Sequence, residues 1–318
     1  MNATDILIIA AQLIGGFFLL FFGGDWLVNG GVALARRFRI SPLVIGMTIV
    51  AFGTSSPELL VSLVSAIKGS AGIAMGNVIG SNNANIGLIL GLTALICPIE
   101  TDNGKVLRNG AVMIIASLLL MVFAIHSGIS HIEGLTLLMG LVLFTVISIR
   151  KGRTKEHDNP VDSPDGKSMS ILAAVGLIVL SCAMLALGAD VLVDGATTLA
   201  SAMEVSDKVI GLTIVALGTS LPELAASVAA AFKKEMDISI GNVIGSNIFN
   251  ILCVLGVSAS IKPISLEFQD YLSDFIWMIG FSVFIIIFTT MRKKKGRLGR
   301  TAGILFLLAY AIYAWSLF

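Results

Sequence analysis

The sequence predicts an all-α membrane protein with ten transmembrane helices in two inverted five-helix repeats. Composition, the placement of Lys and Arg, and an internal duplication support this fold class. The 318 residues are 56% hydrophobic and only 13% charged, whereas soluble domains carry about 25% charged residues. So little charge cannot cover a surface in water, and the lipid bilayer is the expected surroundings. The net charge of +1 argues against a nucleic-acid partner.

Ten segments are apolar enough and long enough to cross a bilayer, which takes about 20 residues each. They are 6–34, 41–67, 72–98, 109–126, 132–149, 170–202, 208–232, 238–261, 271–291 and 300–317. The first follows Asp5 without a basic segment before it, so we interpret it as a retained helix and not a signal peptide. The polar segment 150–169 separates the first repeat, 1–149, from the second, 170–318.

The basic residues predict how the chain is oriented. With ten spans, all of the 21 Lys and Arg residues except Lys68, Lys208 and Lys262 fall on one side of the membrane. Basic residues concentrate on the cytoplasmic side of membrane proteins. We therefore expect an inner-membrane protein with both termini outside and the central linker in the cytoplasm.

Two long motifs occur twice, 165 residues apart. VIGMTIVAFGTSSPELLVS (44–62) matches VIGLTIVALGTSLPELAAS (209–227), and GNVIGSNNANIGLILGLTALICPI (76–99) matches GNVIGSNIFNILCVLGVSASIKPI (241–264). The same offset pairs Asp25 with Asp190 without a gap. Because each repeat has an odd number of spans, the second must enter the membrane from the opposite side. Inverted repeats of this kind are common in transporters, with a binding site at the midplane between broken helices.

Glu58 and Glu223 occupy equivalent positions inside otherwise apolar spans. An ionisable group at the bilayer centre costs at least about 2.5–3.5 kcal/mol, so such groups usually serve a function. Two of them predict a shared polar cavity. The alternative is a protonated or hydrogen-bonded Glu that only holds helices together.

A proline precedes each of these acids, in GTSSPE and GTSLPE. Pro57 and Pro222 remove a backbone donor, which predicts free carbonyls near Ala51–Gly53 and Ala216–Gly218. Unwound backbone at this depth is tolerated only in protein or beside a wet cavity. A simple proline kink, relieved by Thr54 and Thr219, is the other interpretation.

The second motif places polar residues at positions i, i+4 and i+8 of a helix, which lie on one face. These are Asn77, Ser81 and Asn85 in the first repeat, and Asn242, Ser246 and Asn250 in the second. Hydrogen bonding between helices is the structural alternative, and for Asn77 and Asn242 packing and cation binding stay equally open.

The two motifs together offer carboxylate, hydroxyl, amide and carbonyl oxygens, without His, Cys or Met. An all-oxygen site suits hard cations such as Ca²⁺ and equally Na⁺. Competition of both ions for one pair of carboxylates is sufficient for an exchanger. No cofactor is expected.

The doubled GTSSPE/GTSLPE and GNVIGSN motifs resemble the alpha-repeat signature of the sodium/calcium exchanger family, within the cation/calcium antiporter superfamily, and the short linker resembles the compact prokaryotic members. The resemblance implies ten helices in inverted repeats and movement of Ca²⁺ coupled to Na⁺. If Glu58 and Glu223 are the charges of the site, the three Na⁺ typical of the family would leave a net charge of +1, so we expect the exchange to be electrogenic. It implies that Glu58 and Glu223 are the central Ca²⁺ ligands, and that the other ligands are the hydroxyls of Thr54, Ser55, Thr219 and Ser220, the carbonyls of Ala51 and Ala216, and the side chains of Ser81, Asn85, Ser246 and Asn250. Potassium-dependent relatives carry Asp where this chain has Asn250, which argues against potassium co-transport.

Three other functions are alternatives to this one. A proton/calcium antiporter of the same fold could use the same Glu pair, and a passive cation channel would show flux without a counter-ion. An enzyme is not expected, because His126, His131 and His157 lie in loops or at span ends and form no catalytic motif. The cysteines, Cys97, Cys182 and Cys253, give no disulfide framework, and no obligatory protein partner is inferred.

Overall fold

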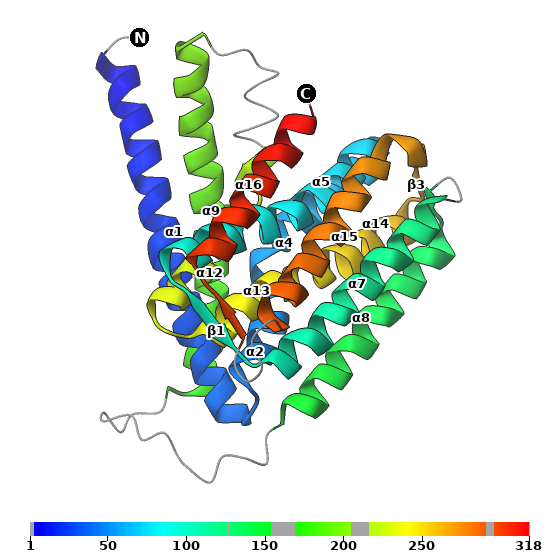
Figure 1. Cartoon of the computed structure of the whole chain (residues 1–318). Helices are drawn as coiled ribbons and strands as arrows, with labels where there is room; N and C mark the ends of the chain where they lie inside the picture. Colours follow the sequence, from blue (N-terminus) through cyan, green and yellow to red (C-terminus); the bar gives the residue numbers. More distant parts are fainter. Residues whose placement is uncertain (1–2, 126–127, 154–168, 205–215, 291–295, 318) are drawn as a thin grey trace.

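The computed structural model describes residues 3–125, 128–153, 169–204, 216–290 and 296–317, and these are almost entirely helical (Figure 1). The first half contains α1 (Ala3–Phe38), α2 (Pro42–Ile45), the π-helix η1 (Gly46–Val50), α3 (Ala51–Thr54), α4 (Ser56–Ile67), α5 (Ala71–Ala84), the π-helix η2 (Asn85–Leu90), α6 (Gly91–Ile96), α7 (Asn103–Ile125) and α8 (His131–Gly152). The second half contains α9 (Ile171–Ala202), α11 (Ala216–Gly218), α12 (Leu221–Phe232), α13 (Met236–Phe249), the π-helix η4 (Asn250–Leu255), α14 (Gly256–Ile261), α15 (Phe268–Thr290) and α16 (Arg300–Ser316).

The helices confirm a multi-pass membrane protein. Seven helices in the described residues are long and apolar enough to cross a membrane. Taken together, Pro42–Thr54 and Ser56–Ile67 make an eighth span, with a bend of 49° between the two helices. The bend lies in the first motif, where a proline kink was the alternative to unwound backbone. Leu221–Phe232 and Arg300–Ser316 are shorter apolar helices. Part of the expected span 208–232 and most of the linker 150–169 lie outside the described residues, so ten spans and the division at the linker stay predictions.

The two halves repeat the same local structure at the 165-residue offset. α4 matches α12, α5 matches α13, η2 matches η4, and α7 matches α15, each residue for residue in its bounds. Residues with positive φ also occur at equivalent positions in the two halves. Arg39 (53°) matches Glu204 (62°), and Gly69 (80°) matches Lys234 (61°). The duplication therefore preserves backbone conformation as well as sequence.

Short strands link the halves, a feature that the all-helical prediction missed. β1 (Ile99–Thr101) pairs with β4 (Gly296–Leu298), and β2 (Gly128–Ile129) pairs with β3 (Ile264–Ser265), both antiparallel. Each pair joins one strand from each half. At two or three residues, these strands are too short to show a period in the sequence.

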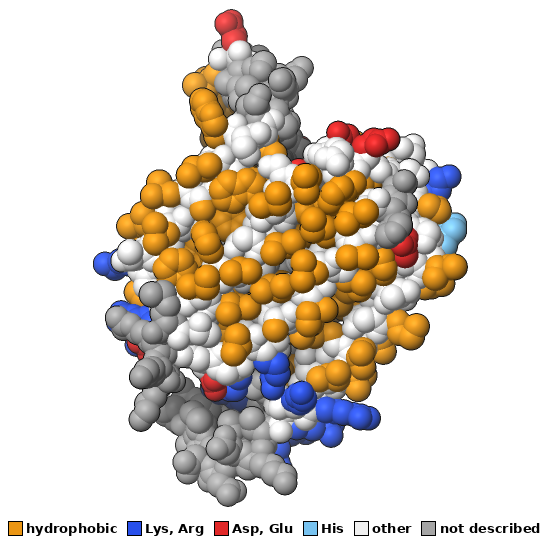
Figure 2. Space-filling view, turned by 45° about the vertical axis from the view of Figure 1, so that its right-hand side comes forward, with side chains coloured by type: hydrophobic (Ala, Val, Ile, Leu, Met, Phe, Trp, Pro, Cys, Tyr) orange, Lys and Arg blue, Asp and Glu red, His pale blue; other side chains and the backbone are white. Residues whose placement is uncertain are grey.

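The duplicated GNVIGSN helices form the centre of the molecule. In the most apolar window of Met236–Ile261, 94% of residues are buried, and 72% are buried in that of Ala71–Ile96, against 22% in that of α1. α1 and α9 run side by side at the edge of the bundle (Figure 1). Figure 2 shows a broad hydrophobic band, with most of the visible Lys and Arg side chains along its lower margin.

Small residues allow α1 and α9 to approach closely, as in other membrane helix pairs. A Cβ built on Gly16 would lie 2.7 Å from the Leu192 Cβ and 2.8 Å from the Gly188 carbonyl oxygen. A Cβ built on Gly188 would lie 2.8 Å from the Leu19 Cβ. By contrast, the neighbouring Gly15 has no atom of the described structure within 4 Å of such a Cβ.

We therefore expect Gly16→Ala to destabilise the protein by roughly 1–3 kcal/mol, the usual cost of overpacking. Gly15→Ala is the matched control, because it adds the same methyl group where space is open. Thermal unfolding in detergent, followed by tryptophan fluorescence, measures both. Equal melting temperatures for the two variants would contradict the close packing of α1 on α9.

Candidate cation site

The two membrane acids each lie in the first turn of a helix that restarts after a break. Ser55 separates α3 from α4, and Pro57 is the second residue of α4, where the missing N–H removes no hydrogen bond of the helix. Thr219 and Ser220 separate α11 from α12 in the same way. Glu58 and Glu223 are 0% exposed. The positive ends of the two helix dipoles therefore face the carboxylates, which helps to stabilise their charge.

The Glu223 carboxylate connects the two halves. Its Oε1 accepts hydrogen bonds from the Ser55 hydroxyl at 2.7 Å and from the Ser246 hydroxyl at 3.4 Å. Its Oε2 and both carboxylate oxygens of Glu58 have no hydrogen-bond partner among the described residues. Three buried carboxylate oxygens without a hydrogen-bond partner are the condition that a bound cation would relieve.

Asn82, Asn85, Asn247 and Asn250 form one hydrogen-bonded group across the centre, which we call the asparagine square. Asn85 Nδ2 donates to Asn247 Oδ1 at 2.9 Å, and its equivalent Asn250 Nδ2 donates to Asn82 Oδ1 at 3.2 Å. Asn82 and Asn247 each donate to the other's backbone carbonyl at 3.3 Å. The amide oxygens of Asn85 and Asn250 stay buried without a partner in the described part of the chain. The square therefore fixes two more oxygens that can accept a cation.

Asn77 and Asn242 position the acids through the backbone. Asn77 Nδ2 donates to the Glu58 carbonyl at 3.2 Å and to Ser62 Oγ at 2.8 Å. Asn242 makes the same bonds in the second half, to the Glu223 carbonyl at 3.3 Å and Ser227 Oγ at 3.0 Å. Of the two roles left open by the sequence, these contacts favour packing.

The remaining predicted ligands differ in whether their oxygens already take part in hydrogen bonds. Thr54 Oγ1 contacts the Ala51 carbonyl at 3.3 Å, Asn242 Oδ1 at 3.2 Å and Ser246 Oγ at 3.5 Å. The Ala51 carbonyl also accepts the Ser55 N–H at 2.9 Å, so it is already hydrogen-bonded. The hydroxyl oxygens of Thr219 and Ser220 are buried without a partner among described residues.

Two predicted ligands add little to this geometry. Ser81 is buried at 4% exposure. Ala216 begins α11 at the edge of the described residues.

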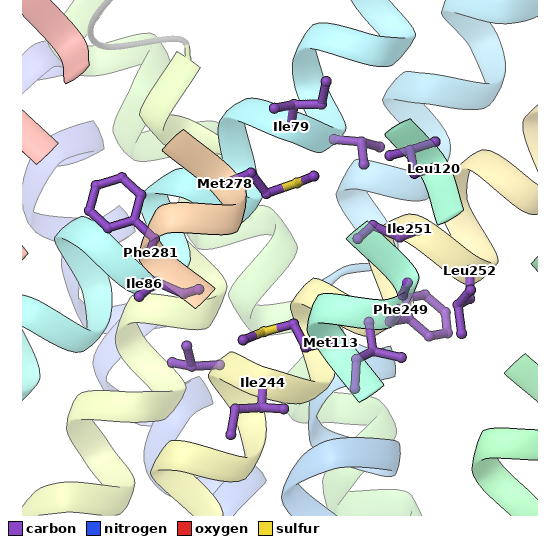
Figure 3. Close-up of a cluster of buried hydrophobic side chains, with 14 of the residues drawn as sticks. Ile79, Ile86, Met113, Leu120, Ile244, Phe249, Ile251, Leu252, Met278 and Phe281 are labelled. Carbon is purple, nitrogen blue, oxygen red and sulfur yellow. The ribbon is translucent and has the colours of Figure 1, made fainter. Parts of the chain in front are cut away.

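Apolar side chains enclose the asparagine square. Met278 Sδ lies 3.6 Å from Asn82 Nδ2, and Met113 Sδ lies 3.5 Å from Asn247 Nδ2. Figure 3 shows both methionines within a cluster that also contains the equivalent pairs Ile79 with Ile244 and Ile86 with Ile251. This envelope excludes water, which strengthens any electrostatic interaction inside it.

A cavity of about 660 Å³ lies beside the broken segments, between the α3–α4 segment and α9. Its lining includes Ser56, Pro57, Cys182, Asp190 and Thr219. Of the predicted ligands, Thr219 lines this cavity, whereas the two carboxylates lie outside its lining.

The site can bind a hard cation through oxygen atoms alone. The described residues contain no cluster of three His, Cys, Asp or Glu side chains, so the two carboxylates would act together with amides and hydroxyls. Sequence reasoning did not single out Asn82 and Asn247, the acceptors that orient Asn85 and Asn250. The signal was present, because GSN is identical in both motifs.

Glu58→Gln and Glu223→Gln should abolish stabilisation by calcium. A ligand at 100 times its Kd stabilises a protein by about 2.7 kcal/mol, so Ca²⁺ should raise the melting temperature of the unmodified chain. In chelator the two variants should be at least as stable as that chain, because each removes a buried charge. Melting curves with EDTA and with Ca²⁺ test this. Glu100→Gln, an exposed change, is the control, and calcium stabilisation that persists in Glu58→Gln and Glu223→Gln would remove these residues from the site.

Asn247→Ala should weaken calcium binding about 10- to 100-fold, the usual effect of losing a group that orients a ligand. Asn82→Ala should have a similar effect, because it removes the equivalent acceptor. Titration calorimetry in detergent measures the Kd. Thr136→Ala, which removes an exposed hydroxyl on α8, should change nothing. An unchanged Kd in both asparagine variants would argue that the square is only structural.

Comparison with known proteins places these features in a family. The family model described as sodium/calcium exchanger protein matches residues 8–150 and 173–318. The sodium/calcium exchanger MaX1 of Methanosarcina acetivorans is 33% identical over 343 aligned positions, covering 96% of this chain and 97% of the relative. The inner membrane protein YrbG of Escherichia coli is 34% identical, covering 98% of both chains.

A solved structure shares the whole architecture. The sodium-calcium exchanger NCX_Mj, soaked with Na⁺ and Ca²⁺, superposes with a TM-score of 0.84 at 36% identity, covering 100% of both chains. The family model and these relatives each extend over nearly the entire sequence and both copies of the motif. The chain therefore belongs to the sodium/calcium exchanger family.

Proposed function

We propose that this protein exchanges Na⁺ for Ca²⁺ by alternating access, with Glu58 and Glu223 as the charged ligands of both ions. The observation that carries the proposal is the set of buried, unpartnered oxygens on Glu58, Glu223, Asn85 and Asn250. Oxygen ligands in a flexible arrangement suit Ca²⁺, and Na⁺ has similar hardness. The remaining predicted ligands, on the broken segments and on Ser81 and Ser246, complete this proposal.

The proposed architecture is ten spans in two inverted repeats. We place the protein in the inner membrane, with both termini outside and the linker in the cytoplasm. Equal helix bounds in the two halves and the reciprocal strand pairs β1–β4 and β3–β2 support the repeat. The margin of Lys and Arg in Figure 2 supports the orientation.

One face of the site is open and the other is packed, which favours alternating access over a passive channel. The cavity opens between α4 and α9. At the equivalent place in the other half, α1 packs on α12 so closely that a Cβ on Gly24 would lie 2.7 Å from the Ala225 carbonyl oxygen. A channel needs a continuous path, whereas an exchanger opens one face at a time.

Charge balance at the site makes the proposed exchange electrogenic. One Ca²⁺ neutralises two carboxylates, whereas the three Na⁺ typical of the family would leave one net positive charge. The sodium-loaded step would then move charge across the membrane and depend on voltage. The proton/calcium antiporter stays the rival, because the same acids can carry protons.

Proteoliposomes loaded with Na⁺ should accumulate radioactive Ca²⁺, and those loaded with K⁺ or choline should not. Uptake should respond to an imposed membrane potential and fall to background in Glu58→Gln and Glu223→Gln, because each variant loses a charged ligand. Added K⁺ should have no effect. Uptake driven by a pH gradient and indifferent to Na⁺ would move the protein to the proton-coupled branch, and voltage-insensitive exchange would contradict the charge balance.

A further inference from the structure

One ion pair in the described structure joins α1 to the end of α12. Lys233 Nζ lies 2.7 Å from Asp25 Oδ1 and donates to Asn29 Oδ1 at 2.6 Å. Asn29 Nδ2 in turn donates to Asp25 Oδ2 at 3.2 Å. Lys233 is the residue that follows the last turn of α12, so this triad fastens α1 to α12 on the packed face.

The same residues occur in the other half. The 165-residue offset takes Lys233 to Lys68, which follows the last turn of α4, and Asp25 to Asp190 on α9. It takes Asn29 to Asp194, so a second acid replaces the amide. We call such an ion pair between two helices a latch. All the groups needed for a second, equivalent latch between α9 and α4 are therefore present.

This second latch is not formed in the structure. Lys68, Asp190 and Asp194 are exposed, and within the described ranges none of them lies within 4.0 Å of an opposite charge. Asp190 instead lines the cavity between α4 and α9. The latch is thus closed on the face where α1 packs on α12, and open on the face where α9 stands away from α4.

We propose that Asp25–Lys233 and Asp190–Lys68 are alternating latches, each closed only when its own face of the site is sealed. This inference rests on the alternating-access exchange proposed above. Movement of the α1–α9 pair toward α4 would close the cavity and bring Asp190 and Asp194 to Lys68. The same movement would withdraw Asp25 from Lys233.

The latches bias the equilibrium between the two states without locking either. Both side chains of the observed pair are partly exposed, at 27% for Lys233 and 37% for Asp25, and exposed pairs are weak. Loss of one such pair changes a two-state ratio about two- to fivefold. A transporter that must cycle needs latches of this strength, since a much stronger pair would trap one state.

Cys182 provides a native reporter, because it lines the cavity. In a Cys97→Ala, Cys253→Ala background in lipid nanodiscs, a charged methanethiosulfonate reagent should modify Cys182 only when the cavity is open. Lys233→Gln and Asp25→Asn should slow modification about two- to fivefold, because they destabilise the state with the open cavity. Lys68→Gln and Asp190→Asn should leave the rate unchanged or raise it, because they destabilise the opposite state.

The neighbouring Lys234→Gln is the matched control for Lys233→Gln and should not change the rate. The charge swap Asp25→Lys with Lys233→Asp should restore the parent rate, which a fault in folding could not explain. Unchanged modification in both Lys233→Gln and Asp25→Asn, or slowing in Lys68→Gln equal to that in Lys233→Gln, would overturn the proposal.

The same preparations, reconstituted in liposomes, separate this proposal from the function on which it rests. If the background protein shows no sodium-dependent Ca²⁺ uptake, the proposed exchange is wrong. If it shows uptake and labelling is slowed in neither Lys233→Gln nor Asp25→Asn, exchange stands and the latches are wrong.

Discussion

Glu58 and Glu223 are buried where water does not solvate them, and an uncompensated buried charge costs a protein roughly several kcal/mol. The surrounding structure makes that burial possible. Each acid lies in the first turn of a helix that restarts after a break, one asparagine donates to the backbone carbonyl of each acid, and Ser55 donates to the carboxylate of the other half. A transported cation would neutralise the negative charge that these contacts leave uncompensated. Under the proposed function, the same two side chains therefore influence both the stability of the fold and the exchange.

Much of this was accessible from the sequence because membrane burial leaves few structural choices. A backbone in lipid must be helical or closed into a barrel, so apolar length alone predicted most helix bounds within a few residues. The doubled motif located both acids and indicated an irregular backbone just before each of them. The π-helices beginning at Asn85 and Asn250 were not predicted, since a single extra residue in a turn leaves no mark on an apolar sequence. The strands β1 to β4 were missed because their pairing joins distant segments.

The contacts around the candidate site were harder to predict from the sequence, for a different reason. A duplicated sequence predicts equal surroundings for equivalent residues, and the asparagine square obeys that symmetry. The helix contacts around it do not, because a single conformation cannot satisfy both halves at once. Gly24 packs on Ala225, while the equivalent position, Ala189, lines a cavity. Which acid receives the Ser55 hydroxyl, and which lysine finds its partner, depends on this broken symmetry and not on residue type.

The cross-pairing of strands and asparagines also has an evolutionary consequence. Asn85 finds its acceptor on Asn247, and Asn250 finds its acceptor on Asn82, so neither half can complete the square alone. An ancestor one repeat long would have needed a second copy of itself, inserted in the opposite direction, to bury these groups. The π-helices η2 and η4 and the matching positive-φ residues occupy equivalent positions in the two halves, as an ancestor that already had them would predict. Fusion of the two genes would then have freed each half to diverge, as Asp274 has from its counterpart Asn109.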